Sequence, residues 1–426
     1  MFLFPIISQA SWEFDNITNK KRVDEGSNKK SLKSSGYWNL EFKIHIDNNW
    51  SETKSTYEWC SGSGTWSDPY IIENVIVNGG NSGSPILIEN SKVYFRIKNC
   101  TFYNSGSGYY PLLNEGGIKM VNVTKGTIIN NTAFDNRVGM VLDNSENNTL
   151  SGNTPNNNNG EGILLYRSNN NLVWGNTVNN NNGAGIRLYR SNNNTISGNT
   201  VNNNNGAGIY LYIRSNNNLV WGNIVNNNNE EGIRLYLSDN NILSGNTANN
   251  NNGAGIYLYQ YNDNNNISEN IANNNIRYGI LLEESNNNLV WGNTANNNKR
   301  SGMYLHHSDN NTLSGNTANY NSDRGIFLHY GNNNTISGNI AINNYYGINL
   351  IFSNYNDIIG NKLFDNNICY SKDETSRENT FKSNLCVKNE PSEADWIISG
   401  VIGIIITSII LIGLSVLFWQ FKRKVK

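Results

Sequence analysis

The amino-acid sequence predicts an all-β fold, a parallel β-helix solenoid with three sheets and about 23 residues per coil. A Gly-Ile or Gly-Met pair recurs eleven times at intervals of 22 to 24 residues, which indicates one structural unit stacked on copies of itself. Apolar residues alternate in short bursts, as in strands. The repeat is also too short for a helix pair, which needs about 33 residues. The glycines of the pair are Gly117, Gly139, Gly162, Gly185, Gly208, Gly232, Gly255, Gly279, Gly302, Gly325 and Gly347.

Each repeat divides into three short strands joined by tight corners. In the coil that begins at Gly185, Ile186 and Leu188 mark the first strand, Ile196 the second and Val201 the third. Gly, Asn and Ser fill the corners, where they tolerate left-handed and turn conformations. The apolar residues are expected to point inward and to form one continuous column, which is buried only when neighbouring coils stack.

The Asn-rich phrases are expected to form ladders along the axis of the rod. Asn is a poor strand former, but stacked Asn side chains can hydrogen-bond from coil to coil. A disordered Asn-rich tract is the alternative, and it is disfavoured because the apolar columns keep their register throughout. The predicted ladder positions are Asn153, Asn176, Asn199, Asn223, Asn246, Asn270, Asn293, Asn316, Asn339 and Asn361.

The segments around the repeats complete the predicted organisation. Residues 1–10 are interpreted as the remnant of a signal peptide, residues 11–69 as an N-terminal lead and cap, and residues 70–365 as the β-helix. A strand is expected over residues 40–46. Residues 366–395 are expected to form the C-terminal cap and linker.

The C-terminal end predicts a single membrane span. Residues 396–421 carry no charge and are long enough, at 1.5 Å per residue, to cross a hydrocarbon core of about 30 Å. The basic tail at residues 422–426 predicts a cytoplasmic C-terminus and a β-helix outside the cell. A net charge of -1 gives no electrostatic case for nucleic acid.

Four cysteines flank the repeats and are consistent with an extracellular location. Cys60 and Cys100 precede them, and Cys369 and Cys386 follow them. Four cysteines allow three pairings. The local pairing, Cys60–Cys100 and Cys369–Cys386, is the hypothesis that would pin both ends of the solenoid.

When the repeats are aligned, the outward positions of the first strands form one stripe along the rod, in which aromatic and Arg side chains recur. Sugar rings stack on aromatic faces and Arg binds carboxylates, so an extended, acidic glycan is a candidate ligand. The alternative is a Tyr ladder that only stabilises the sheet, and this is the favoured reading of the two. The candidate glycan-binding residues are Tyr166, Arg187, Tyr189, Tyr210, Tyr212, Arg234, Tyr236, Tyr257 and Tyr259.

Glu283, His306 and His329 continue the same stripe on consecutive coils. Strands about 4.8 Å apart would let the two imidazoles share a copper or zinc ion. Incidental exposed polar residues are the alternative, and it is favoured because the chain has four His and four Met residues and no tract rich in either. No obligatory cofactor is therefore predicted.

Trp174, Trp221 and Trp291 share one position in the second strand and are expected to face outward. Either glycan platforms or packing at the coil edges would explain them, and the sequence does not separate the two.

The phrase Gly-Ile-x-Leu followed by Asn-Asn-x-Ile-Ser-Gly-Asn resembles the right-handed β-helix of carbohydrate-binding proteins and sugar hydrolases. Over residues 70–365 it is most similar to the NosD-type periplasmic copper-binding β-helix and to archaeal surface proteins built from that domain. The resemblance implies a right-handed helix, with copper handling as one function. These repeats lack the Asp-Asp, Gly-His-Gly and Arg-x-Lys phrases of the related hydrolases, and glycoside hydrolysis needs paired carboxylates.

The sequence thus favours a non-catalytic, membrane-anchored rod with a structural or adhesive role. Its expected partners are the membrane and extracellular glycans or surface proteins. A NosD-type copper-binding accessory protein is the alternative function, and a polysaccharide lyase or hydrolase is the third.

Overall fold

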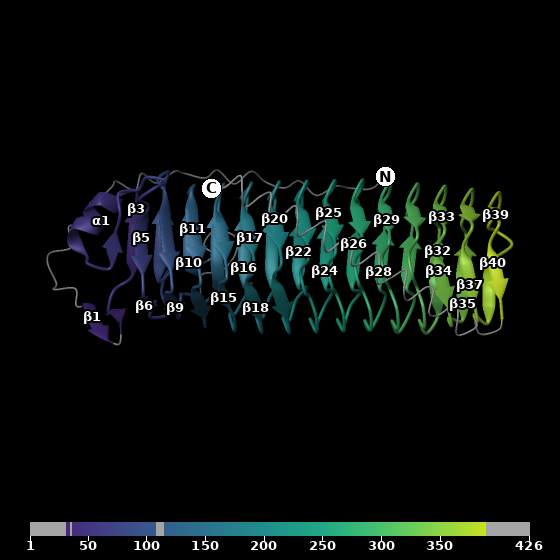
Figure 1. Ribbon diagram of the computed structural model, residues 1–426, viewed down its shortest axis with the longest axis horizontal. Coiled ribbons are helices and arrows are strands. Elements are labelled where there is room, and N and C mark those ends of the chain that lie inside the picture. The colour runs from purple at the N-terminus through teal and green to yellow at the C-terminus, as the bar shows by residue number, and fades with distance from the viewer. Residues whose placement is uncertain (1–30, 35, 108–114, 389–426) are drawn as a thin grey trace, which may run out of the picture.

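A computed structural model describes residues 31–34, 36–107 and 115–388, which form one long rod of stacked coils (Figure 1). The rod has about 14 turns, and a typical turn advances the register by 23 residues, as in the pairing of Ile163 with Ile186. Two long sheets run along its length, and all their strand pairs are parallel except the first pair of the second sheet, at Cys60–Ser61. The predicted all-β solenoid is therefore confirmed.

The first sheet has 14 strands, made by the opening strand of each coil. They are β3 (Ile44–Asp47), β7 (Ile86–Glu89), β10 (Gly116–Val121), β13 (Val138–Asp143), β16 (Ile163–Tyr166), β19 (Ile186–Tyr189), β22 (Ile209–Tyr212), β24 (Ile233–Tyr236), β26 (Ile256–Tyr259), β28 (Ile280–Glu283), β30 (Met303–His306), β32 (Arg324–His329), β35 (Tyr346–Ile351) and β38 (Ile368–Lys372).

The second sheet has 15 strands and also extends from one end of the rod to the other. They are β4 (Cys60–Ser61), β5 (Tyr70–Glu73), β8 (Phe95–Lys98), β11 (Gly126–Ile129), β14 (Thr149–Ser151), β17 (Leu172–Trp174), β20 (Thr195–Ser197), β23 (Leu219–Trp221), β25 (Ile242–Ser244), β27 (Asn266–Ser268), β29 (Leu289–Trp291), β31 (Thr312–Ser314), β33 (Thr335–Ser337), β36 (Asp357–Ile359) and β39 (Thr380–Lys382).

The third face is not one continuous sheet, which corrects the prediction of three parallel sheets. Between Thr200 and Ile340 each coil contributes a single bridge to the next. The chain there carries one inward Val or Ala among Asn residues, which are poor strand formers. Strands occur nearer the ends: β1 (Ser31–Ser34), β2 (Tyr37–Leu40), β6 (Val75–Asn78), β9 (Thr101–Tyr103), β12 (Thr132–Phe134), β15 (Thr154–Pro155), β18 (Thr177–Asn179), β21 (Thr200–Asn202), β34 (Ile340–Ile342), β37 (Lys362–Phe364) and β40 (Leu385–Val387).

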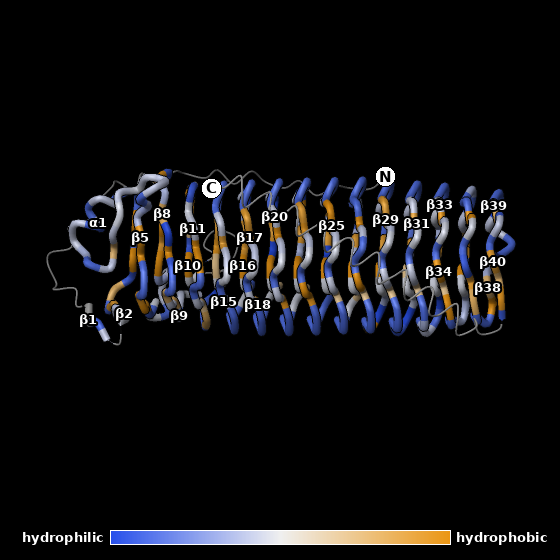
Figure 2. The backbone as a smooth tube through the Cα atoms, viewed as in Figure 1, coloured by the Kyte–Doolittle hydropathy of each residue, from blue (hydrophilic) through white to orange (hydrophobic). Residues whose placement is uncertain are grey.

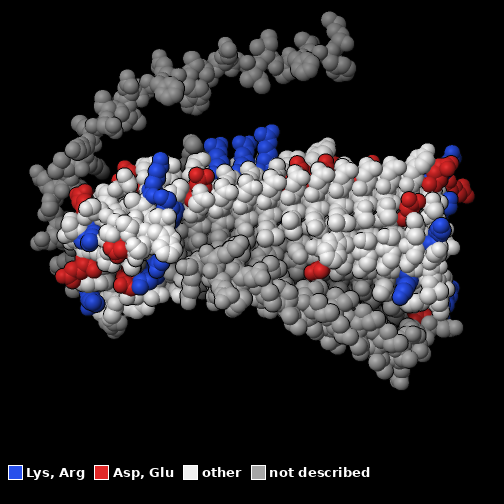
Figure 3. All heavy atoms as spheres, turned by 45° about the horizontal axis from the view of Figure 1, so that its top comes forward, with Lys and Arg blue, Asp and Glu red and all other residues white. Residues whose placement is uncertain are grey.

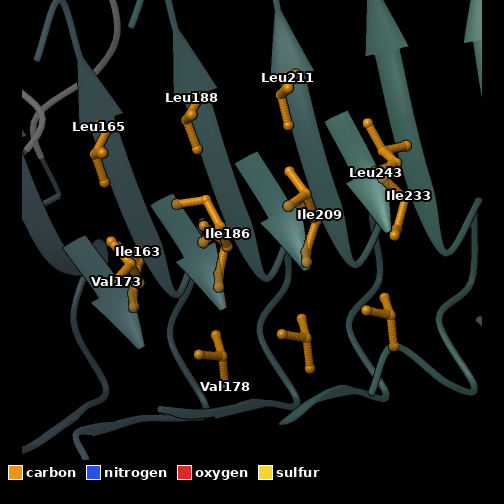
Figure 4. Close-up of a cluster of buried hydrophobic side chains, with 14 of the residues drawn as sticks. Ile163, Leu165, Val173, Val178, Ile186, Leu188, Ile209, Leu211, Ile233 and Leu243 are labelled. Carbon is orange, nitrogen blue, oxygen red and sulfur yellow. The ribbon is translucent and has the colours of Figure 1, made fainter. Parts of the chain in front are cut away.

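The inward residues form one apolar column along the axis. Ile186, Leu188, Ile196 and Val201 of one coil are each fully buried, as predicted. The same positions in neighbouring coils stack directly on them (Figure 4). Figure 2 shows the resulting pattern, in which apolar and polar segments recur at the same place in successive coils.

The recurring glycine of the Gly-Ile pair is required by close packing. A Cβ added at Gly185 would lie 2.2 Å from Val201 Cγ1 and 2.7 Å from the carbonyl oxygen of Gly208 in the next coil. A different glycine, Gly198 in the Ser-Gly-Asn phrase, has a φ of 58° and open space around it. The repeat therefore uses glycine for two separate reasons, close approach at one corner and a left-handed turn at another.

Buried Asn ladders cross the coils at the corners, and the predicted ladder is confirmed. Asn199 donates from Nδ2 to Oδ1 of Asn223 at 2.9 Å, and its backbone N–H donates to the same oxygen at 3.0 Å. Asn131 and Asn384 extend this ladder at its two ends. A second ladder comprises Asn136, Asn158, Asn181, Asn204, Asn228, Asn251, Asn275, Asn298, Asn321, Asn344 and Asn366. A third ladder comprises Asn148, Asn171, Asn194, Asn218, Asn241, Asn265, Asn288, Asn311, Asn334, Asn356 and Asn379.

The N-terminal end carries a short helix, α1 (Trp50–Thr56), that the sequence did not predict. Trp50 is 1% exposed, stacks on Tyr70 and donates its indole N–H to Ser91. The expected strand over residues 40–46 is two strands, β2 and β3, separated by a turn. The helix and the stacked rings of Trp50 and Tyr70 together cover the apolar column at this end.

A disulfide between Cys369 and Cys386 joins β38 to β40 at the C-terminal end, as predicted, with the two Cα atoms 5.9 Å apart. Within the described ranges, no helix is long and apolar enough to span a membrane. The predicted signal-peptide remnant at 1–10, membrane span at 396–421 and basic tail at 422–426 lie outside the described residues.

Candidate functional site

The predicted stripe lies on the outer face of the first sheet as two columns in register. Leu164, Leu281 and Phe327 in the second column are buried by their neighbours. The register is observed, whereas a ligand for the stripe remains a prediction. The first column is Tyr166, Tyr189, Tyr212, Tyr236, Tyr259, Glu283, His306 and His329. The second is Leu164, Arg187, Tyr210, Arg234, Tyr257, Leu281, Tyr304 and Phe327.

The Tyr rings of the first column stack on one another along the axis. The centroids of Tyr166 and Tyr189 are 4.9 Å apart with planes at 9°, and those of Tyr212 and Tyr236 are 5.4 Å apart at 20°. Tyr189 and Tyr212 are tilted by 49°, but the other neighbouring rings cover each other's faces, so the stripe presents mainly ring edges and phenol groups to a ligand. Stacking of a sugar on these faces, as the sequence suggested, is thus largely blocked, and hydrogen bonding remains available.

Arg187 and Arg234 are packed between the Tyr rings and are paired with acids. The Arg187 guanidinium lies 4.6 Å from the ring centroid of Tyr212, and its Nη1 lies 2.9 Å from Glu161 Oε1. Arg234 Nη1 lies 3.6 Å from Glu231 Oε2, and burial raises the pKa of that Glu231 carboxyl. The positive charge of these two residues is therefore largely compensated within the stripe.

Buried phenol groups in the second column keep their protons. Burial is the main reason that the pKa of Tyr210 rises to about 12, and the nearby Arg234 and Arg187 only partly oppose it. The pKa of Tyr257 is raised by burial and by its hydrogen bond to the carboxylate of Glu283. These hydroxyls are neutral at physiological pH and act as both donors and acceptors.

Glu283, His306 and His329 occupy consecutive coils, but their geometry is that of a stack. The His306 and His329 rings are 5.2 Å apart and nearly parallel, at 22°. His306 Nδ1 lies 3.6 Å from Glu283 Oε1, and His329 Nδ1 is hydrogen-bonded to Tyr304 at 3.1 Å. Among residues 31–34, 36–107 and 115–388, no three His, Cys, Asp or Glu side chains converge as metal ligands. The three side chains lie in one column on consecutive coils, and a metal ion shared by them stays a prediction.

A depression of 360 Å³ lies on the stripe where its first Tyr residues begin. Tyr166, Tyr189 and Tyr212 form part of its wall, together with Arg187 and Glu161. A second depression of 620 Å³ lies near the N-terminal end, beside the exposed Trp66 and between Tyr94 and Lys125. The sequence singled out neither residue: Trp66 precedes the repeats, and Lys125 lies in the first repeat, at a corner outside the strand columns.

Trp174, Trp221 and Trp291 face outward on the second sheet, as predicted. Trp174 is 45% exposed and Trp291 is 37% exposed. Trp174 and Trp221 flank Ser197, so two strand spacings of about 4.8 Å separate them. None of the three indoles stacks on another ring in the described part of the chain, which leaves faces open that the Tyr column does not offer.

Cys60 and Cys100 are buried free thiols, so the predicted Cys60–Cys100 bond is wrong. Cys60 pairs with Ile72, and Ile72 pairs with Ile97 on the far side, so β4, which holds Cys60, and β8, which ends just before Cys100, lie about 9.6 Å apart. Cys100 instead heads the first Asn ladder, since its backbone N–H donates to Asn131. Burial raises the pKa of Cys60 to about 11 and that of Cys100 to about 12.

Comparison with known families agrees with this architecture. A family described as right-handed β-helix region matches residues 222–363 and 292–401, and the periplasmic copper-binding protein NosD family matches residues 112–231. The chain is a right-handed β-helix protein. No curated protein matches this β-helix protein.

Solved structures of similar shape come from several proteins. The mannuronan C-5 epimerase AlgE6 A-module of Azotobacter vinelandii has a TM-score of 0.56 at 14% identity, covering 74% of this chain and 92% of its own. The AlgE4 A-module of the same organism has a TM-score of 0.50 at 14% identity, covering 72% and 87%. The Dettilon tailspike protein has a TM-score of 0.50 at 16% identity, covering 71% and 62%. At these identities the likeness shows the fold alone.

Proposed function

We propose that this β-helix protein is a membrane-anchored, extracellular rod with a structural or adhesive role that binds extended glycans along its Tyr/Arg stripe without catalysis. The main support for glycan binding is the stripe itself, in which Tyr and Arg side chains lie in register on one face of the first sheet. A linear ligand parallel to the axis would meet the same groups in each coil.

Hydrogen bonding is the contact that this surface offers. Tyr189 stacks on Tyr166, Tyr212 stacks on Tyr236, and Arg187 packs against the Tyr212 ring, so these contacts hold both phenol groups in place. Preorganised donors and acceptors lose little entropy on binding a hydroxyl-rich ligand. Sugar hydroxyls match this arrangement better than an apolar ligand would.

Membrane anchorage follows from the sequence of residues 396–421 and the basic residues after them. We expect the rod to remain with the membrane fraction after a high-salt wash and to be accessible to protease in intact cells. Release of the full-length chain by salt alone would contradict this part of the proposal.

Copper handling is the second candidate, because the NosD family matches residues 112–231. That segment contains neither His nor Cys, and its Met120 and Met140 are buried in the core. Imidazole and thiolate are the usual protein ligands of copper. The matched segment therefore lacks the side chains that would bind copper most readily. A Cu²⁺ titration by calorimetry that gave stoichiometric heat would revive this candidate.

Two of the structurally similar proteins are named as epimerases of mannuronan, so a polysaccharide-modifying enzyme is the third candidate. Glycoside hydrolysis would need a pair of carboxylates facing one bond. Glu161 in the wall of the depression forms an ion pair with Arg187, and Glu231 forms one with Arg234. Carboxylates that are paired in this way favour binding without turnover.

A glycan array tests the proposal with two matched variants. Tyr189→Phe/Tyr212→Phe removes only the hydroxyls and keeps the ring stack, so binding is expected to fall roughly tenfold. Trp174→Ala/Trp221→Ala removes two of the three Trp side chains on the outer face of the second sheet, which is the other candidate glycan surface. Loss of binding in the Trp variant alone would move the site to the second sheet. Absence of binding to every glycan by the wild-type protein would leave only the structural role.

A further inference from the structure

Three exposed Arg residues occupy one corner of three consecutive coils. Arg167, Arg190 and Arg214 each precede a Ser of a buried stack, in which the N–H of Ser168 donates to Ser191 at 2.9 Å and that of Ser191 to Ser215 at 3.2 Å. This register sets the three Arg backbones at intervals of about 4.8 Å. Basic side chains gather in a row on one edge of the rod, which otherwise shows few charges along much of its length (Figure 3).

This row is electrostatically costly for the isolated protein. Like charges opposite one another on neighbouring strands are destabilising. Within the described residues, none of the three guanidinium groups forms an ion pair with a carboxylate, although Asp143 in the preceding coil is close enough for Arg167 to influence its pKa. In other coils the same corner holds uncharged side chains such as Asn144 or Phe352, or the acidic Glu284.

Ring contacts hold two of these guanidinium groups against the Tyr column. Arg167 lies 5.0 Å from the ring centroid of Tyr166, and Arg190 lies 5.3 Å from that of Tyr189. Stacking on a ring leaves the N–H edges of the guanidinium free to donate to an anion. The depression is lined by Tyr166, Tyr189 and Tyr212, each of which lies next to or two residues from an Arg of the row, so row and depression lie on the same coils.

We infer that Arg167, Arg190 and Arg214 form an anion-recognition row that selects acidic polysaccharides, with one carboxylate per sugar facing one guanidinium per coil. This deepens the glycan binding proposed above and rests on it. The interval of about 4.8 Å between coils is close to the length of one pyranose ring in an extended chain. Guanidinium groups bind carboxylates bidentately, which gives the row geometric as well as electrostatic selectivity.

An acidic glycan fits this surface better than nucleic acid does. Single-stranded nucleic acid is usually held by aromatic faces on which bases stack. Here the faces of Tyr166 and Tyr189 cover each other, and only ring edges and hydroxyls are presented.

The test uses the full-length protein and a fluorescent oligogalacturonate, followed by anisotropy at low and at physiological salt. Arg167→Gln/Arg190→Gln/Arg214→Gln is expected to bind the oligomer roughly tenfold more weakly than wild type. Lys299→Gln/Lys362→Gln/Lys382→Gln is the matched control, because it removes the same charge from exposed positions elsewhere and is expected to bind like wild type. Wild-type affinity is also expected to fall as salt is raised.

The carboxyl-reduced, neutral form of the same oligomer separates this inference from the proposed function. Equal binding of both forms by wild type and by the Arg variant would overturn the anion row but leave glycan binding by the stripe intact. Tighter binding of inorganic polyphosphate or single-stranded DNA of equal charge would overturn the choice of an acidic glycan. Unchanged affinity of the Arg variant for oligogalacturonate, with circular dichroism showing a native fold, would also refute the inference.

Discussion

Replacing Asn223 by Ala tests whether the buried Asn ladders hold the rod together. The Asn223 side chain accepts two hydrogen bonds from Asn199, at 3.0 and 2.9 Å, and donates to Asn246 and to the carbonyl of Ile196, both at 2.9 Å. The residue is 1% exposed. These four hydrogen bonds at about 1 kcal/mol each, with a longer fifth at 3.2 Å to the carbonyl oxygen of Trp221 and with the Asn199 N–H left unpaired in the interior, predict a loss on the order of 4 kcal/mol.

The matched control is Asn229→Ala in the same coil. The Asn229 side chain donates to Asn205 at 3.0 Å and accepts from Asn252 at 3.3 Å, but both bonds lie at the exposed surface, where water replaces them. Its cost is expected to be about 0.5 kcal/mol or less. Urea unfolding of both variants measures the difference, and proteolysis locates the opened coils, since each coil contacts only its neighbours. Equal destabilisation by the two substitutions would refute the claim that buried amide ladders carry the stability.

Three further predictions concern the coil corner, the His stack and the C-terminal end. Gly185→Ala forces a Cβ to within 2.2 Å of Val201 Cγ1, so its urea midpoint is expected to fall clearly below wild type, and an unchanged midpoint would show that the coils shift freely. Burial and neighbouring positive groups lower the pKa of His329, so the unfolded chain binds more protons. Thermal stability is therefore expected to fall as the pH drops below about 6.5, and to fall less in His329→Phe; identical pH profiles would contradict this. Reduction of the Cys369–Cys386 bond is expected to increase proteolysis at the C-terminal coils first, as peptide mapping would show, and uniform cleavage would argue against that bond as a local clamp.

The period of the sequence was sufficient to predict most of the fold. Once the Gly-Ile pairs set the register, alternation placed Ile186 and Leu188 inside and Tyr189 outside, and the structure agrees. The ladder through Asn199 and Asn223 followed from the same register. Periodicity succeeds here because in-register stacking turns a sequence position into a spatial column.

Other features depend on side-chain packing that register alone does not give. The Tyr column was expected to offer ring faces to sugars, but neighbouring rings cover those faces. The candidate pair His306 and His329 is adjacent as expected, yet its rings stack without converging. Cys100 sits at the head of an Asn ladder, a role that no spacing between cysteines reveals. The same register aligns Arg190 with Arg167 and Arg214 at the corner beside the predicted stripe. The sequence prediction covered only the strand positions and therefore left this row out.

The in-register coils also make the length of this protein adjustable. Each described repeat presents the same donors and acceptors to the coil before it and to the coil after it, as the repeated bonds through Asn176, Asn199 and Asn223 show. A whole repeat can therefore be gained or lost by unequal recombination in the gene without creating a new kind of contact. Each such event would move the two ends apart or together by about 4.8 Å. Natural variants that differ by multiples of 23 residues would then carry the same kind of surface on rods of different length.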